Sequence, residues 1–241
     1  MTVAATTALA VAGSDTDART YTTASWTPTP GTVYSLALGV HDLGGQPVPG
    51  GWPTPSGNNI TWQRIGEDVG GSSTEPIFAV WSGVATTFAT AGAITWTDLG
   101  PVGGTVDGVI WGMVGFSSVA YNSTDRGFVQ SNRASTNVDT VTVTLSAFSS
   151  SANAAGAWVL AYDNAGGAIT FTAGSGFSFV TQASQASGGD TMRLGFEFRN
   201  TNDTSVDVTA SASNDRLLMH AVEIRDGFAL DYPKIIMLNK N

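Results

Sequence analysis

The sequence predicts an all-β protein, folded as a two-sheet antiparallel β-sandwich of jelly-roll type. Many short segments alternate apolar with polar residues and are separated by turns rich in Gly, Pro, Ser and Asp, as strands of a sandwich are. Helix formers are scarce, because the 241 residues include only four Glu and two Lys, while Thr, Ser, Gly and Val are abundant. The regular alternation of strands and helices that a parallel sheet requires is missing.

Residues 109–116 form the longest compact apolar run and predict a central strand. Alternate side chains of a strand point to opposite faces. Here both faces are apolar, with Val109, Trp111 and Met113 on one and Ile110, Val114 and Phe116 on the other. The run is too short to cross a membrane as a helix, and its two interior glycines disfavour a buried helix. We therefore expect a strand that is covered on both sides.

A similar pattern near the end of the chain, at residues 215–224, raises the question of an internal repeat. Each half of the chain offers five strand-like segments. They are residues 33–40, 60–65, 77–81, 94–97 and 109–116 in the first half, and 157–162, 177–180, 192–198, 206–212 and 217–224 in the second. Two interpretations are open, a five-strand pseudo-repeat or one sandwich with two similar edges.

The predicted domain organisation is one sandwich between two terminal segments. Residues 1–19 are small and polar and are expected to form an N-terminal arm. Residues 20–227 contain the strand-like segments and form the sandwich, and residues 228–241 form a C-terminal docking tail. The alternative is two small sandwiches that divide near residue 125.

The tail concentrates its apolar residues in one run, Ile235, Ile236, Met237 and Leu238. The two lysines of the chain, Lys234 and Lys240, flank this run. Such a run left in water promotes aggregation, so we expect it to be covered. We predict that these four residues dock on a partner. The alternative is that the tail packs on its own sandwich, since termini are usually tied down in this way.

Two tryptophans are candidate contacts for a glycan or a partner protein. Trp26 lies just before a Pro-rich stop, and Trp52 lies in residues 43–59, whose prolines and glycines predict a surface loop. An aromatic ring at the surface is suited to a sugar or a protein contact. For Trp52 the alternative is that it folds back and caps the end of the sandwich. A second loop is expected at residues 120–137.

Four other tryptophans fall within predicted strands and are assigned to the core: Trp62, Trp81, Trp96 and Trp111. Two further segments alternate clearly. In residues 139–146, Val141, Val143 and Leu145 are expected to point inward. In residues 192–199, Phe196 and Phe198 are expected to be buried, while Arg193, Glu197 and Arg199 are expected to form an exposed polar face.

Composition and motifs exclude several functional classes. The net charge of −9 disfavours nucleic acid as a partner, because a phosphate backbone would be repelled. Cysteine is absent and there are two histidines, His41 and His220, so a disulfide framework and a Cys/His zinc site are excluded. Turn carboxylates at Asp15–Asp17 and at Asp163 suit calcium, but neither forms a full calcium loop.

Catalytic signatures are also missing. The chain has no metalloprotease helix motif, no serine-hydrolase elbow, no P-loop and no dinucleotide fingerprint. The dipeptide His41-Asp42 does not by itself make a catalytic site. We therefore predict a protein that is not an enzyme and that has no catalytic, cofactor-binding or metal-binding residues. We expect neither a signal peptide nor a membrane-spanning segment, and no membrane partner.

The succession of residues 33–40, Gly57–Trp62, Phe78–Gly83 and 218–224 resembles a group of β-sandwich proteins of tailed-phage particles. These occur as head-decoration, head-fibre or tail-associated proteins. The resemblance covers about residues 30–226, and its matching residues are mostly core positions, so it carries over no functional residue. The Pro-rich loop 43–59 and the tail after Gly227 depart from the pattern.

This resemblance implies a non-enzymatic virion structural protein with a decoration or accessory role on a capsid or tail surface. Its partners would be other virion proteins, in a homo-oligomeric or shell-bound state, and it would reside in the virion after assembly in the host cytoplasm. The alternative function is a carbohydrate-binding or adhesion module for host-surface glycans, with Trp26 and Trp52 as contacts.

Overall fold

A computed structural model describes residues 2–41, 52–68, 76–99, 106–121, 126–187, 189–211 and 216–227. In these ranges the chain forms strands, turns and bends and no helix, which confirms the all-β prediction. The strands are β1 (Ala4–Ser14), β2 (Tyr21–Thr22), β3 (Val33–His41), β4 (Trp62–Asp68), β5 (Ile77–Val84), β6 (Thr95–Trp96), β7 (Gly108–Ser117), β8 (Phe128–Thr136), β9 (Thr140–Thr144), β10 (Ala154–Asp163), β11 (Phe171–Ala173), β12 (Ser178–Ser187), β13 (Asp190–Arg199), β14 (Ser205–Ala210) and β15 (Arg216–Ile224).

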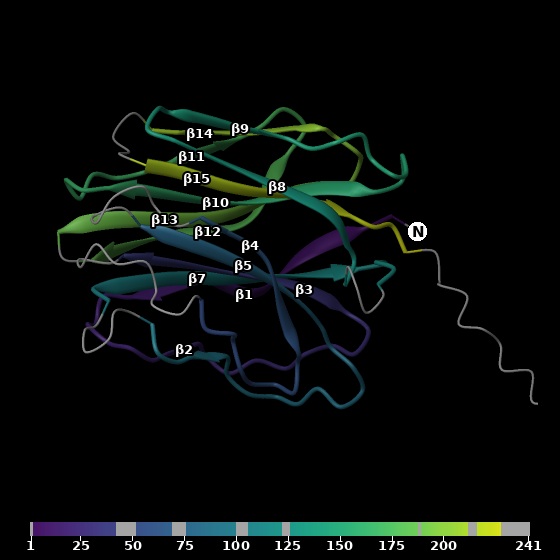
Figure 1. Cartoon of the computed structure of the whole chain (residues 1–241), viewed down its shortest axis with the longest axis horizontal. Helices are drawn as coiled ribbons and strands as arrows, with labels where there is room; N and C mark the ends of the chain where they lie inside the picture. The colour runs from purple at the N-terminus through teal and green to yellow at the C-terminus, as the bar shows by residue number, and fades with distance from the viewer. Residues whose placement is uncertain are drawn as a thin grey trace, which may run out of the picture.

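The strands are stacked in four layers. Two five-stranded antiparallel sheets, in the orders β1-β7-β3-β5-β4 and β12-β13-β10-β15-β8, pack face to face in the middle. The two-stranded sheet β2-β6 covers the outer face of the first, and the three-stranded sheet β11-β14-β9 covers the outer face of the second. Figure 1 shows this order from β9 and β14 at the top to β2 at the bottom.

Each gap between layers contains a hydrophobic core. The inner core includes Phe78, Phe116, Trp158 and Phe196, and the two outer cores include Trp81, Trp96 and Met113 on one side and Val141, Val206 and Met219 on the other. The central strands β7 and β10 are therefore buried on both faces, as the apolar run 109–116 predicts for β7. Burial on both sides explains why their sequences do not alternate between apolar and polar residues.

The chain is duplicated in its topology. Each large sheet comes from one half of the chain, and the orders become identical when β1, β3, β4, β5 and β7 are matched with β8, β10, β12, β13 and β15. The flanking pair β2-β6 matches β9-β14, and β11 is an addition in the second half. The duplication is therefore present, and the five predicted segments of each half match pairwise. The repeated unit is larger than the predicted five strands, because β1 and β2 also correspond to β8 and β9. A jelly-roll type is not confirmed, since each half builds one complete large sheet. The halves divide between β7 and β8, close to residue 125, but they share the inner core.

Two segments that the sequence analysis left outside the strands are edge strands. The expected arm, residues 1–19, contains β1, which pairs with β7, so the sandwich begins near residue 4 rather than residue 20. The expected loop, residues 120–137, contains β8, which pairs with β15. Most side chains of both strands are exposed or partly exposed. Edge strands of this kind lack the apolar alternation on which the prediction relied.

The predicted inward faces are confirmed for Val141, Val143 and Leu145, and for Trp96, Trp111 and Phe196, which are all buried. Phe198 is partly buried against the inner core. Arg193 and Arg199 are partly exposed. The prediction that Glu197 is exposed is wrong, because its side chain is fully buried. The alternation of β13 is as expected, but the small sheet β11-β14-β9 covers the face that the sequence analysis assigned to water.

Candidate functional site

Trp26 lies at a surface groove. It is the one tryptophan of the seven that is not buried, and all seven lie within the described residues. The groove has a volume of about 330 Å³ and runs between β1, the segment that leads into β3, and the end of β7. Its lining residues are Thr6, Thr7, Ala8, Trp26, Thr27, Thr29, Thr32, Tyr34, Gly115 and Ser117. The sequence singled out Trp26, but the other residues come together only in the fold, from three separate segments.

The Trp26 ring is held in one orientation by its surroundings. Its backbone N–H donates to the carbonyl of Gly92 (2.9 Å), and its carbonyl accepts from the N–H of Gly92 (3.0 Å). The ring packs edge-on against Tyr34, with 4.8 Å between ring centroids. Tyr34 is itself buried, and its hydroxyl accepts a hydrogen bond from the N–H of Thr29 (2.9 Å). The indole is therefore a fixed platform at the groove.

The floor of the groove depends on Gly115. A Cβ at this position would lie 2.9 Å from Cε1 of Tyr34 and 3.2 Å from Cγ2 of Thr32, so a larger residue would displace the side chains that form the groove. Among the lining residues there is no charged side chain. The surface that results combines one aromatic ring with several hydroxyl groups.

Trp52 does not lie at the surface. Its side chain is 7% exposed and packs edge-on against Trp81, with 5.8 Å between ring centroids. Trp96 and Trp111 continue this row of rings, each 6.3 Å from the one before it. Trp52 thus belongs to the outer core of the first half, which fits the alternative that it folds back on the sandwich. We retain only Trp26 as a candidate surface contact.

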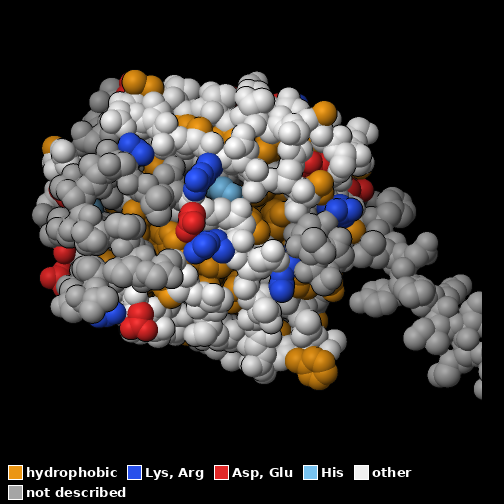
Figure 2. All heavy atoms as spheres, in the orientation of Figure 1, with side chains coloured by type: hydrophobic (Ala, Val, Ile, Leu, Met, Phe, Trp, Pro, Cys, Tyr) orange, Lys and Arg blue, Asp and Glu red, His pale blue; other side chains and the backbone are white. Residues whose placement is uncertain are grey.

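A second hollow lies where the two halves meet at β4 and β8. Its volume is about 380 Å³, and it is lined by Arg64, Ile65, Gly66, Glu67, Ser131, Asn132, Arg133 and His220. Arg64 and Glu67 form an ion pair at 3.2 Å. Figure 2 shows a pale-blue histidine side chain among blue basic and red acidic side chains near the middle of the face that it presents. The Asn132 amide donates to the carbonyl of Thr144 (2.8 Å), so part of the lining also joins strands.

His220 lies at the base of this hollow and is 3% exposed. Burial lowers the pKa of His220 to about 4; a hydrogen bond to the Ile65 carbonyl opposes this shift, and Arg133 adds to it. The imidazole is therefore neutral near pH 7. It lies so close to Gly66 that a Cβ there would overlap the ring. The close approach identifies His220 as a residue that joins the two halves.

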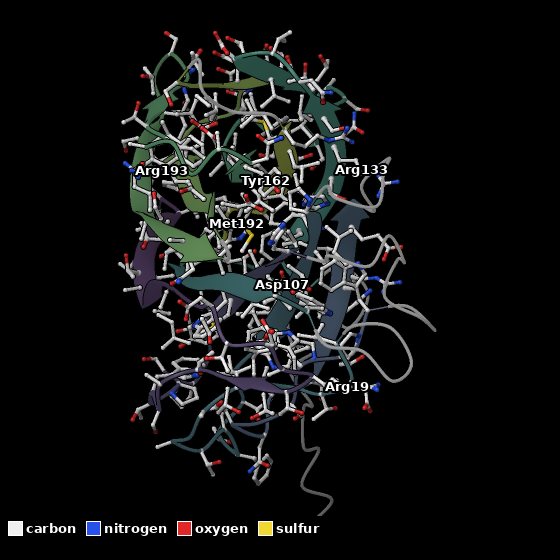
Figure 3. All side chains as sticks on the ribbon, turned by 90° about the vertical axis from the view of Figure 1, so that its left-hand side faces the viewer. Arg19, Asp107, Arg133, Tyr162, Met192 and Arg193 are labelled. Carbon is white, nitrogen blue, oxygen red and sulfur yellow. The ribbon has the colours of Figure 1, made fainter. Side chains whose placement is uncertain are left out.

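His41 is part of a cluster that links the halves at one end of the sandwich. Its Nε2 lies 3.1 Å from Oδ2 of Asp190 and 3.1 Å from the hydroxyl of Tyr162, and that hydroxyl donates to Asp190 Oδ2 (2.8 Å). Figure 3 views this end and shows Tyr162 in the interior, near Met192. His41 is only 1% exposed. The predicted neighbour Asp42 lies outside the described residues.

Two buried glutamates have different hydrogen-bonding environments. Glu223 accepts hydrogen bonds from Ser149, Asn153 and Gln130, at distances between 2.5 and 2.9 Å. Glu197 accepts one from the N–H of Gly174 (3.1 Å). Burial raises the pKa of Glu197 to about 8; the Gly174 contact opposes this shift, and nearby Asp207 adds to it. The burial of Glu197 did not follow from the local sequence, because Glu197 occupies a polar position of an alternating strand, which resembles an exposed one. Glu223 lies in β15, which is buried on both faces.

Within the described residues, no group of three or more His, Asp or Glu side chains is placed to hold a metal ion. The described part of the chain also contains no helix that is long and apolar enough to span a membrane. The predicted docking residues, Ile235, Ile236, Met237 and Leu238, lie outside the described part of the chain. Their role stays a prediction.

The sequence matches no protein-family model and no curated protein.

Proposed function

We propose that this protein is a non-enzymatic structural protein of a tailed-phage particle that docks on the capsid or tail surface in a decoration or accessory role. The likeness of its strand succession to β-sandwich proteins of such particles suggests the class. The observation that carries the proposal is the use of buried polar groups as ties between strands. Glu223 joins β15 to β8 and to residues 149–153, and Asp190 joins His41 to Tyr162.

A rigid body supports such a role. Two half-sandwiches share an inner core, and each is closed on its outer face by a further small sheet. Core packing of this extent resists local opening, since local stability follows the number of buried contacts. A particle accessory protein needs a fixed shape more than a moving lid. Attachment to the particle is proposed to use the apolar run 235–238 of the tail, which could add a strand to a partner's sheet edge.

The direct test is the composition of purified particles. Particles of the phage that carries the gene, purified by density gradient, should contain peptides of this protein in a fixed ratio to the major capsid protein. Its absence from intact particles, with the protein found free in the lysate, would overturn the proposal.

A rebinding experiment tests the tail. Particles that lack the protein should bind the full chain but not a variant in which Ile235, Ile236, Met237 and Leu238 are replaced by Ser. A matched control replaces Lys234 and Lys240 by Ala and keeps the apolar run, and it should still bind. Equal binding of the Ser variant would place the attachment elsewhere. Both variants should keep the melting temperature of the full chain if the tail docks on a partner.

A carbohydrate-binding role is the second candidate function. The groove at Trp26 favours it, because a partly exposed indole lies there among hydroxyl-bearing side chains. The two functions are compatible, since an accessory protein on a particle surface can also hold a glycan.

A further inference from the structure

We propose that the groove at Trp26 binds a neutral pyranose sugar, with one face of the sugar ring against the Trp26 indole and the sugar hydroxyls bonded to Thr and Ser side chains. This inference develops the second candidate function and is independent of attachment to a particle.

The aromatic platform is the first argument. One face of a pyranose ring presents C–H groups, which pack on an aromatic ring, while its hydroxyls remain free for hydrogen bonds at the edge. Trp26 is fixed through Gly92 and Tyr34, so binding does not have to order it. The six other tryptophans are buried and cannot serve in this way.

The hydroxyl groups are the second argument. Thr27, Thr29, Thr32 and Ser117 line the groove, and their side-chain hydroxyls make no hydrogen bond to any residue that the structure describes. The hydroxyls of Thr6 and Thr7, by contrast, are used internally, with acceptors at the carbonyls of Gly115 and Val180. Four hydroxyls that can both donate and accept are suited to the hydroxyls of a sugar.

Charge and size define the ligand class. The lining contains no charged side chain, and the chain as a whole carries a net charge of −9, which disfavours an acidic sugar. A volume of about 330 Å³ falls at the lower end of the range of small-molecule sites, about 300–1,000 Å³. The groove is therefore matched to a short neutral saccharide rather than to a long chain.

The test measures binding of the full chain to methyl glycosides of glucose, galactose, mannose and N-acetylglucosamine, and to neutral oligosaccharides of each, by calorimetry up to tens of millimolar. Glucuronic acid and sialyllactose serve as acidic comparisons. Tryptophan fluorescence with acrylamide as quencher gives a second readout, because Trp26 is the partly exposed one of the seven. A bound neutral sugar should reduce the quenching.

Variants assign the site. Trp26→Ala should lower the affinity at least ten-fold, and Trp26→Phe, which keeps a ring, should lower it by less than about five-fold. Thr32→Val removes a hydroxyl at nearly constant shape and should weaken binding several-fold. Phe88→Ala is the matched control, since Phe88 is an aromatic residue that is 80% exposed and does not line the groove. It should bind as the wild type does.

Three outcomes would overturn the proposal: no neutral saccharide binds the wild type, acidic sugars alone bind, or Trp26→Ala binds as well as the wild type. If Trp26→Ala does not fold, the sugar affinity of the double variant Thr27→Val with Thr32→Val is the deciding measurement. An unchanged affinity would contradict the proposed orientation of the sugar. Particle composition is measured separately, so failure of the sugar site is distinguishable from failure of the structural role.

Discussion

The hydroxyl of Ser131 donates a hydrogen bond to the carbonyl of Ile65 (3.2 Å), and this contact joins β8 in the second half to β4 in the first. The hydroxyl of Thr7 donates in the same way to the carbonyl of Val180 (3.0 Å), which joins β1 to β12. In both cases the accepting residue is the extra one of a β-bulge, at the same place in β4 and β12. The duplication therefore extends from the strand order to single hydrogen bonds.

These two contacts should make similar contributions to stability. We expect Ser131→Ala and Thr7→Val each to lower the free energy of unfolding by about 0.5–1 kcal/mol, the range of one modest hydrogen bond. The double variant should show the sum of the two losses. The β4–β8 contact and the β1–β12 contact lie at opposite edges of the two large sheets and share no partner, so their effects should be independent. Denaturant unfolding measures all three. Thr142→Val, at an exposed position of β9, is the control and should change the free energy of unfolding little. A strong departure from additivity would show that the two contacts are energetically coupled.

Gly66 should tolerate no side chain. A Cβ there would overlap the imidazole of His220, a rigid ring that is packed between the halves. We expect Gly66→Ala to destabilise the protein by about 1–3 kcal/mol, as overpacking usually does. Combining it with His220→Ala should cost less than the sum of the two single variants, because the shortened side chain leaves room for the new methyl group. Simple additivity in thermal or denaturant unfolding would contradict the close contact.

The stability of the protein should fall in mild acid through His220. Its folded-state pKa of about 4 lies below the ordinary value near 6.5, so the unfolded chain binds the proton first as the pH falls. The contribution of neutral His220 to the free energy of unfolding is fully present above pH 6.5. It decreases from there toward pH 4, by an amount on the order of 3 kcal/mol. His220→Gln, which does not titrate, should lack this part of the acid dependence. Parallel stability curves for the two proteins between pH 4 and 6.5 would argue against a buried neutral imidazole.

Glu197 should have the opposite pH dependence. Its folded-state pKa of about 8 lies above the ordinary value near 4.5, so the folded protein keeps the proton longer as the pH rises. Stability should therefore fall between pH 4.5 and 8, on the order of 5 kcal/mol in total. Glu197→Gln should remove this fall and gain stability relative to the wild type toward pH 8. Glu67→Gln, at a partly exposed ion pair, is the control and should leave the slope unchanged. Identical slopes for wild type and Glu197→Gln would refute the assignment.

Several features of the fold were predictable from the sequence because they depend on local patterns. The run 109–116 is apolar in both phases, and its strand β7 is buried on both faces. The five segments proposed for each half correspond to matching strands of the two large sheets and of the small outer sheets. Trp62, Trp81, Trp96 and Trp111 are core residues, as their positions within strands indicate.

The candidate site was predictable only in part. Trp26 stood out because it is an aromatic residue next to a Pro-rich turn. The groove around it draws on β1, residues 26–34 and the end of β7, which are separated by up to about a hundred residues in the chain and are brought together by sheet pairing. Trp52 stood out for the same reason as Trp26, yet it is buried against Trp81.

By itself the sequence determined where most strands lie and which side chains share a face, because strand periodicity and turn residues are local properties. It left open whether the two halves follow one plan, and the strand order of the two large sheets decides that they do. The tertiary structure decided what covers each face. Glu197 has the alternation of an exposed residue, but the added layer β11-β14-β9 removes it from water and raises its pKa. β1 and β8 lack a strong pattern and become strands because β7 and β15 offer unpaired hydrogen-bonding edges. Burial and edge pairing depend on residues distant in sequence, so neither can be inferred from a local pattern.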